Sequence, residues 1–276
     1  MPTFIRQDAS IYYEVRGQGE PLLLIAGLAS DSQSWGASAA MLARTRQLIL
    51  IDNRGCGRTH GSYARIGVAD LADDCAALLA HLGIAHAAVL GHSMGGFVAL
   101  EFALRHRERV SRLVLAATVA ASPARTNALL HDWAQRLEAG ADAASWFREL
   151  FRWIFSAAVY DDERTMDELT RLALEYPYPQ SAADFRRQVE AIAAFDRRAD
   201  LPHVDVPALV LAGANDVLFP PDEVTALARA LAQARLAVVP AAAHALALEN
   251  PARFSDEVLS FLAQADGGVA AASARR

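Results

Sequence analysis

Short apolar runs alternate along this chain with longer stretches in which apolar residues recur at helical spacing. A run that is apolar at every position suits a strand covered on both faces, and such strands occur mainly in parallel sheets. The alternation therefore predicts an α/β fold in which a mainly parallel sheet is flanked by helices. The expected strands span residues 10–16, 21–26, 47–52, 87–90, 112–117, 208–212 and 236–239, and the expected helices span 33–44, 68–82, 94–106, 222–232 and 251–263.

The alternation stops between residues 122 and 200, where aromatic residues recur at helical spacing without a good buried strand. Strand-like runs resume at Pro207, so an insertion between two strands fits better than an autonomous helical domain. We expect a first part of the core over 1–121, a helical cap over 122–200 and a second part of the core over 201–265. Residues 266–276, rich in Gly, Ala, Ser and Arg, are expected as a flexible tail.

The composition excludes several classes of protein. Hydrophobic residues make up 53% of the 276 residues and charged residues 21%, which is enough for a large core and too apolar for disorder. The formal net charge is −6, and all 26 basic residues are arginines that form no basic cluster. This pattern disfavours a nucleic-acid partner. The lack of lysine also removes any mechanism that depends on a lysine side chain.

The cysteines and the termini bear on where the protein works. Cys56 and Cys75 are too few for a disulfide framework, and they do not form a metal-binding pair. The start of the chain shows no secretory signal, and no stretch reaches the roughly 18 apolar residues that a bilayer span needs. We therefore expect a cytoplasmic protein with a small-molecule substrate and no membrane partner. The sequence leaves the oligomeric state open.

A candidate nucleophile lies in the segment Gly91-His92-Ser93-Met94-Gly95, which follows one expected strand and opens a helix. Glycines two positions before and after Ser93 allow a sharp strand-to-helix turn that lifts the serine hydroxyl above the sheet edge. The alternative is a Gly-rich turn with a helix-capping serine. The adjacent His92 is expected to point away from Ser93 on so tight a turn, as a packing or hydrogen-bonding residue.

A serine hydroxyl needs a base within hydrogen-bond reach, and chain order selects the candidates. With this kind of turn, the acid and then the histidine follow the serine. Asp216 comes directly after an expected strand, and His244 lies in the loop after the next strand. Asp216 could instead be a solvated loop carboxylate, and His244 could cap the final helix. The nearby Asp222 and Glu223 are expected in a first helical turn, where the helix dipole favours acidic residues.

Five segments follow one another along the chain with a characteristic order and spacing. They are Leu24-Ile25-Ala26-Gly27-Leu28, Asp52-Asn53-Arg54-Gly55-Cys56-Gly57-Arg58-Thr59, the Ser93 turn, Gly213-Ala214-Asn215-Asp216, and His244 through Glu249-Asn250-Pro251. Through these segments the chain resembles the α/β-hydrolase superfamily over residues 10–264, and it is closest in style to bacterial esterases, enol-lactone hydrolases and carbon–carbon bond hydrolases. The resemblance implies an α/β-hydrolase fold with a sheet of about eight strands, a helical cap inserted after strand 6, and no metal or organic cofactor.

The resemblance also implies an oxyanion hole formed by the backbone N–H groups of Leu28 and Met94. Many family members carry His-Gly where this chain has Ala26-Gly27, and a serine is common at the position of Thr59. Neither departure removes a backbone donor. The serine at the turn excludes dehalogenases and epoxide hydrolases of this fold, which need a carboxylate there. The absence of lysine disfavours cyanohydrin cleavage by a cap lysine.

These residues predict a serine hydrolase in which Ser93, His244 and Asp216 act as nucleophile, general base and orienting acid. The expected substrate is a carboxylic ester or lactone of small to medium size and fairly apolar character. Two alternatives stay open: a carbon–carbon bond hydrolase acting on a diketone or ring-fission product, and a ligand-binding protein that has retained the triad.

The cap carries the candidates for substrate binding, each of which has a structural alternative. Aromatic residues could line an apolar pocket or pack against the core. Arginines could recognise a substrate carboxylate or lie in solvent, and Cys56 is expected to be structural rather than reactive. The aromatic candidates are Trp133, Trp146, Phe147 and Trp153, and the arginines are Arg125, Arg148 and Arg152.

Overall fold

The computed structural model describes residues 2–264, and the tail expected over 266–276 lies outside them. A sheet of nine strands crosses the molecule in the order β1-β2-β4-β3-β6-β7-β8-β9, and the short β5 pairs with β2 beside this path. All neighbours from β4 to β9 are parallel, whereas β2 is antiparallel to β1, β4 and β5. The strands are β1 (Thr3–Arg6), β2 (Ala9–Arg16), β3 (Glu20–Ile25), β4 (Arg46–Ile51), β5 (His60–Gly61), β6 (Ala87–His92), β7 (Val110–Ala116), β8 (Ala208–Gly213) and β9 (Ala234–Val239).

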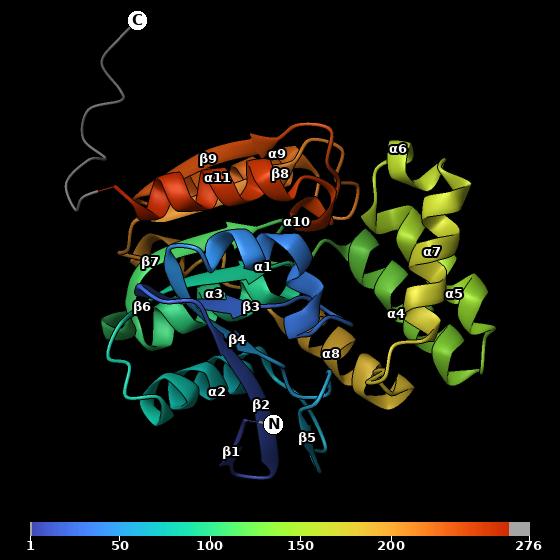
Figure 1. The fold of residues 1–276 in the computed structure, drawn as a ribbon, viewed down its shortest axis with the longest axis horizontal. Coiled ribbons are helices and arrows are strands. Elements are labelled where there is room, and N and C mark those ends of the chain that lie inside the picture. Colours follow the sequence, from blue (N-terminus) through green and yellow to red (C-terminus); the bar gives the residue numbers. More distant parts are fainter. Residues whose placement is uncertain (1, 265–276) are drawn as a thin grey trace, which may run out of the picture.

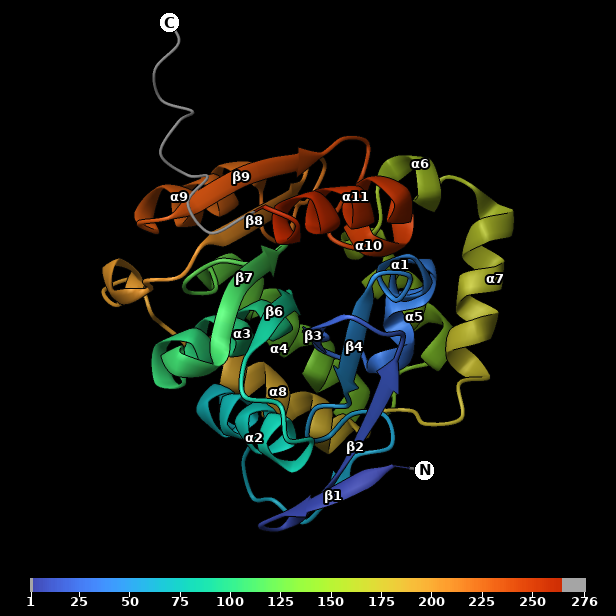
Figure 2. The ribbon, with the colours of Figure 1, turned by 60° about the vertical axis from the view of Figure 1, so that its left-hand side comes forward.

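Helices cover both faces of the sheet because its central strands are apolar on both sides (Figures 1 and 2). One face packs against α2 (Val68–His81), α3 (Met94–Arg105) and α9 (Pro221–Ala230). The other face packs against α1 (Gly36–Leu42) and α11 (Pro251–Leu262). The strands β6 and β8 are therefore almost entirely buried, and β3 and β4 are buried over their last four residues, as the apolar runs predict.

The cap follows β7, which is the sixth strand of the eight-strand path in chain order, and it lies at the carboxyl ends of the strands (Figure 1). The two ends of the insertion meet in an antiparallel bridge between Ala121 and Asp196. This mainly parallel sheet, with eight strands on its main path and a helical insertion after the sixth, confirms the predicted architecture. We retain 122–200 as the proposed extent of the cap. Its helices are α4 (Ala124–Glu138), α5 (Ala143–Ile154), α6 (Ala157–Tyr160), α7 (Glu163–Leu174) and α8 (Ala182–Ala194).

The structure differs from the sequence-based expectation at several short elements. The helix expected over 33–44 is divided into a 3₁₀ turn and α1, because Gly36 adopts a φ of +48° at the junction. The apolar pattern did not predict the strands β1 and β5, because they are short and largely exposed. The remaining short elements are η1 (Ser32–Trp35), η2 (Arg107–Arg109), η3 (Leu201–His203) and α10 (Leu246–Glu249).

Across residues 2–264, no helix combines the length and the apolar character that a bilayer span requires.

Truncation of a central strand residue tests the packing of the sheet. The Leu90 side chain of β6 is fully buried, so Leu90→Ala should lower the free energy of unfolding by about 3 kcal/mol through lost burial and a residual cavity. Ile5 is 74% exposed, and Ile5→Ala should change the free energy of unfolding by less than about 0.5 kcal/mol. Urea titrations of both variants measure the difference. Equal effects would contradict the assigned burial of β6.

Candidate active site

Ser93 lies at a turn that only small neighbours permit. Its backbone has a φ of +55°, which is strained for a residue with a side chain and recurs at functional turns. A Cβ atom at Gly91 would lie 2.0 Å from the carbonyl oxygen of Gly95, and one at Gly95 would lie 2.0 Å from that of Ile25. The two glycines therefore let α3 start directly against β6 and β3.

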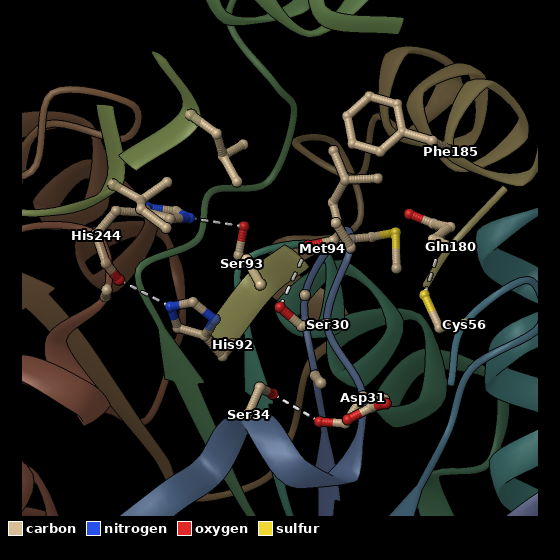
Figure 3. Close-up of a pocket in the computed structure, with 18 of the residues that line it drawn as sticks. Ser30, Asp31, Ser34, Cys56, His92, Ser93, Met94, Gln180, Phe185 and His244 are labelled. Atoms are coloured by element: carbon tan, nitrogen blue, oxygen red, sulfur yellow. Dashed lines mark hydrogen bonds between the residues drawn. The ribbon is translucent and has the colours of Figure 1, made fainter. Parts of the chain in front are cut away.

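Three predicted site residues meet at the carboxyl ends of the strands. His244 Nε2 lies 2.8 Å from Ser93 Oγ, and His244 Nδ1 lies 2.9 Å from Asp216 Oδ2. Figure 3 shows the His244 ring directed at the Ser93 hydroxyl. Asp216 and His244 are 3% and 5% exposed, so this chain of hydrogen bonds is screened from water along most of its length. The arrangement lets the imidazole accept the serine proton while the carboxylate holds its opposite nitrogen.

Asp216 is fixed by the turn that follows β8. Its Oδ1 accepts hydrogen bonds from the backbone N–H groups of Leu218 at 2.9 Å and Phe219 at 3.0 Å, which leaves Oδ2 for His244. A carboxylate held in this way keeps the proton of a neutral His244 ring on Nδ1. The Nε2 atom is then free to act as a base toward Ser93.

His92 supports the loop that carries His244. Its Nε2–H donates to the backbone carbonyl of His244 at 2.8 Å, and its ring points away from the Ser93 hydroxyl, as the tight turn predicts (Figure 3). Burial first, and then the neighbouring His244 ring, lower the pKa of His92 to about 4. His92 therefore stays neutral near neutral pH and acts through its hydrogen bond.

Glu249 is a positioning residue that the sequence reasoning missed. Its Oε1 accepts from the N–H of Ala243 at 2.7 Å, directly before His244, and its Oε2 accepts from the N–H of Ser156 in the cap at 3.0 Å. The N–H of Ala245 donates in turn to the carbonyl of Ile154 at 2.9 Å. The His244 loop is therefore tied to the end of α5. Only the Glu249-Asn250-Pro251 motif marked this residue in the sequence, without indicating its contacts.

The backbone N–H groups of Leu28 and Met94 are placed beside Ser93. A Cβ atom on Gly27 would lie 3.1 Å from Ser93 Cβ, so the loop after β3 passes directly next to the serine. Met94 is the first residue of α3, where the helix dipole favours negative charge. Neither N–H has an acceptor among residues 2–264. Both are therefore available to an oxygen atom that enters the site, and their role as an oxyanion hole stays a prediction.

A cavity of about 500 Å³ lies above Ser93, between the core and the cap, and its size suits a small to medium organic molecule. Trp133, Trp146 and Phe147 line it, together with Leu150 and Phe151 of α5. Trp153 lies outside this lining, so the cavity gives its predicted part in substrate binding no support. The cavity face of α5 runs through residues 147, 150, 151 and 154, and the Trp153 indole N–H donates instead to Glu149 at 3.1 Å.

The three cap arginines do not reach this cavity. Arg125 pairs with Glu223, Arg148 pairs with Glu163 and Asp167, and Arg152 contacts Tyr160. The cavity lining found among residues 2–264 contains no arginine, and the whole chain contains no lysine. The site therefore offers no cation to a substrate carboxylate.

Cys56 lies in the cavity wall but is held as a thiol. Its Sγ lies 3.5 Å from Gln188 Oε1 and accepts from Gln188 Nε2 at 3.1 Å. Burial raises the pKa of the Cys56 thiol to about 12, so the nucleophilic thiolate is scarce near neutral pH. The geometry supports a structural role. Within the described residues, no group of three or more His, Cys, Asp or Glu side chains is placed to hold a metal ion.

Comparisons with known proteins place these features in a wider context. The model of the alpha/beta hydrolase fold family matches residues 20–251. A relative from Azorhizobium caulinodans, named "Putative carbamate hydrolase RutD", is 32% identical, with 96% of this chain and 100% of that protein covered. The solved enol-lactonase from Burkholderia xenovorans has a TM-score of 0.86 and 25% identity, covering 95% of this chain and 100% of that chain. A thermophilic esterase from Thermogutta terrifontis has a TM-score of 0.81 and 27% identity, covering 92% of this chain and 93% of that chain.

The half-buried His92 predicts a specific dependence of stability on pH. The pKa of His92 in the folded protein is about 4, below its ordinary value of 6.5. Between pH 4 and 6.5 this histidine is therefore protonated in the unfolded chain and neutral in the folded one. Stability should therefore fall as the pH drops from 6.5 to 4. His92→Asn keeps a hydrogen-bond donor but does not titrate. The variant should lose roughly 2 kcal/mol less than the wild type across this range, since partial exposure of His92 reduces the full effect.

Urea titrations at pH 7, 5.5 and 4.5 measure this difference directly. The other titrating groups are common to both proteins, so the comparison isolates the histidine. Parallel curves for wild type and His92→Asn would contradict the assigned environment of His92.

Proposed function

Since this chain belongs to the alpha/beta hydrolase fold family, we propose that it is a serine hydrolase that cleaves a carboxylic ester or lactone through an acyl-enzyme on Ser93. The observation that carries the proposal is the 2.8 Å contact between His244 Nε2 and Ser93 Oγ at the floor of the cavity. A serine with its base already in reach is suited to attack an acyl carbon.

The first half of the reaction forms the acyl-enzyme. Ser93 Oγ attacks the substrate carbonyl carbon while His244 Nε2 accepts the serine proton. Asp216, 2.9 Å from His244 Nδ1, stabilises the imidazolium that results. The N–H groups of Leu28 and Met94 then donate to the tetrahedral oxyanion, and each such donor contributes about 3 kcal/mol in comparable sites. His244 returns the proton to the leaving alcohol oxygen as the carbon–oxygen bond breaks.

The second half restores the enzyme. A water molecule takes the place of the alcohol next to His244. His244 removes a proton from this water as the water oxygen attacks the acyl carbon. The same two N–H groups donate to the tetrahedral oxyanion. As it collapses, the bond from the acyl carbon to Ser93 Oγ breaks, His244 returns the proton to Ser93 Oγ, and the carboxylic acid is released. A lactone follows the same steps, except that its alcohol stays joined to the acyl group and leaves with it.

The walls of the cavity support a fairly apolar substrate. Trp133, Trp146, Phe147 and Phe151 form much of the cap side, and burial of a hydrocarbon chain among them is favourable by about 25 cal/mol per Å². The similar enol-lactonase and thermophilic esterase support the ester and lactone classes. The cleavage of a ring-fission product that carries a carboxylate has less support, because no arginine lines the described cavity.

Hydrolysis of p-nitrophenyl esters from acetate to decanoate tests the proposal. Wild type should turn over esters of intermediate length best, as a cavity of about 500 Å³ implies. Ser93→Ala should keep the fold and lose at least about a thousandfold in turnover, because nothing replaces the nucleophile. Ser255→Ala is a matched control, since Ser255 is a buried serine of α11 outside the cavity, and it should retain turnover.

Two outcomes would contradict the proposal. Near-normal turnover by Ser93→Ala would remove Ser93 from the mechanism. Stoichiometric release of p-nitrophenol by wild type, without steady-state turnover, would favour a ligand-binding protein that has retained the triad.

A further inference from the structure

One wall of the cavity is polar, in contrast to the aromatic cap side. It is formed by the loop after β3 and by the segment that joins α7 to α8. Figure 3 shows side chains of both segments, with Gln180 and Cys56 on the far side of Met94 from His244. The proposed reaction uses none of these side chains. The residues that contribute polar groups to this wall are Ser30, Asp31, Ser34, Tyr176 and Gln180.

The Gln180 amide has a fixed orientation. Its Nε2 donates to the backbone carbonyl of Gly55 at 2.9 Å and to Gln188 Oε1 at 3.0 Å, and it also contacts Cys56 Sγ at 3.3 Å. Gln188 is fully buried and is itself held by a bond from its Nε2 to the carbonyl of Arg54 at 2.8 Å. Rotating the Gln180 amide would bring its oxygen against two other oxygens. The network therefore specifies which end of the amide faces the cavity.

The end of the Gln180 amide that faces the cavity is its oxygen atom, a hydrogen-bond acceptor to which no donor is bound. Gln180 Oε1 is buried and has no hydrogen-bond partner among residues 2–264. In Figure 3 it points away from Cys56, toward the side of the cavity where Met94 lies. A buried carbonyl without a partner costs free energy, and native structures seldom leave one unpaired. An oxygen held in this direction is suited to a hydrogen-bond donor that enters the cavity.

The charged groups of the same wall limit the charge that a bound ligand can carry there. Asp31 is 5% exposed, and its carboxylate accepts from the Tyr176 hydroxyl and from the N–H of Gln33 at 2.8 Å. Burial raises the pKa of Asp31, and the nearby charge of Asp52 acts in the same direction. The hydroxyls of Ser30, Ser34 and Tyr176 already donate to other acceptors on this wall. Arg58 lies near Asp31 but pairs with Asp52 and Glu14 and is not part of the described lining. The wall therefore suits a ligand that donates a hydrogen bond better than it suits an anion.

We propose that Gln180 accepts a hydrogen bond from a hydroxyl or amide N–H group of the substrate and thereby selects esters or lactones that carry such a donor. This inference rests on the proposed function and adds the substrate class to it. The donor lies away from the reacting carbonyl, while the apolar part of the substrate packs against the cap. A plain alkyl chain leaves Gln180 Oε1 unpaired, and a carboxylate repels it.

A series of p-nitrophenyl esters with four to eight carbons in the acyl chain tests this selection. At each length, the chain ends in a methyl, hydroxyl, primary amide or carboxylate group. At the best length, wild type should show a kcat/KM about fivefold to tenfold higher for hydroxyl or amide ends than for methyl ends. Carboxylate ends should react at least about tenfold more slowly than methyl ends. Gln180→Met removes the acceptor at similar volume and should bring the ratio of hydroxyl to methyl close to about 1.

Gln188→Met is the matched control. It removes one acceptor of Gln180 Nε2, but the Gly55 carbonyl still accepts from that Nε2 at 2.9 Å and keeps the amide in its orientation. No atom of the described cavity lining is lost, so the preference for hydroxyl ends should remain. Loss of the preference in Gln188→Met to the same degree would show a purely structural effect and overturn the inference. A wild-type ratio near 1 at every length would also overturn it, because Gln180 Oε1 would then bind only water. In both cases, turnover of methyl-ended esters would leave the proposed function standing, whereas no turnover of any ester would contradict both.

Discussion

The close contact of β6, α3 and β3 around Ser93 is the constraint on which the rest of the site depends. A Cβ atom at Gly95 would lie 2.0 Å from the carbonyl oxygen of Ile25, so only glycine lets the helix approach the neighbouring strand. This approach holds Ser93 at a φ of +55° and makes Met94, the next residue, the first of α3. The strain is retained because the buried sheet on either side fixes the turn.

The cap and the core contribute different parts of the same cavity. The core supplies the polar groups at the ends of β6, β8 and β9, and the cap supplies most of the apolar wall. Glu249 joins the two, since its carboxylate binds the N–H of Ala243 next to His244 and the N–H of Ser156 in the cap. The position of the proposed base is thereby linked to the cap that encloses the substrate.

Much of the core architecture follows from the sequence, because a run such as residues 208–212 is apolar at every position and short, which favours a strand covered on both faces. The Ser93, Asp216 and His244 contact was also predictable, since all three follow strand ends that meet at one edge of the sheet. Which side chains of the cap face the cavity was not predictable from the sequence. From the sequence, Trp146 and Trp153 of α5 are equally good candidates for the cavity wall. Only the packing of that helix decides that, of these two, Trp146 lines the cavity. The roles of Glu249 and Gln180 depend on long-range hydrogen bonds that no local pattern records.

Covalent labelling tests the central claim, that His244 activates Ser93 for attack. Wild type is incubated with an alkyl fluorophosphonate, whose phosphorus takes the place of the acyl carbon and whose fluoride leaves, and the protein is digested for mass spectrometry. The account predicts one adduct, on the peptide that contains Ser93, and labelling slowed at least about a hundredfold in His244→Ala, which lacks the base 2.8 Å from Ser93 Oγ. Labelling at another residue, or equal rates in wild type and His244→Ala, would contradict it.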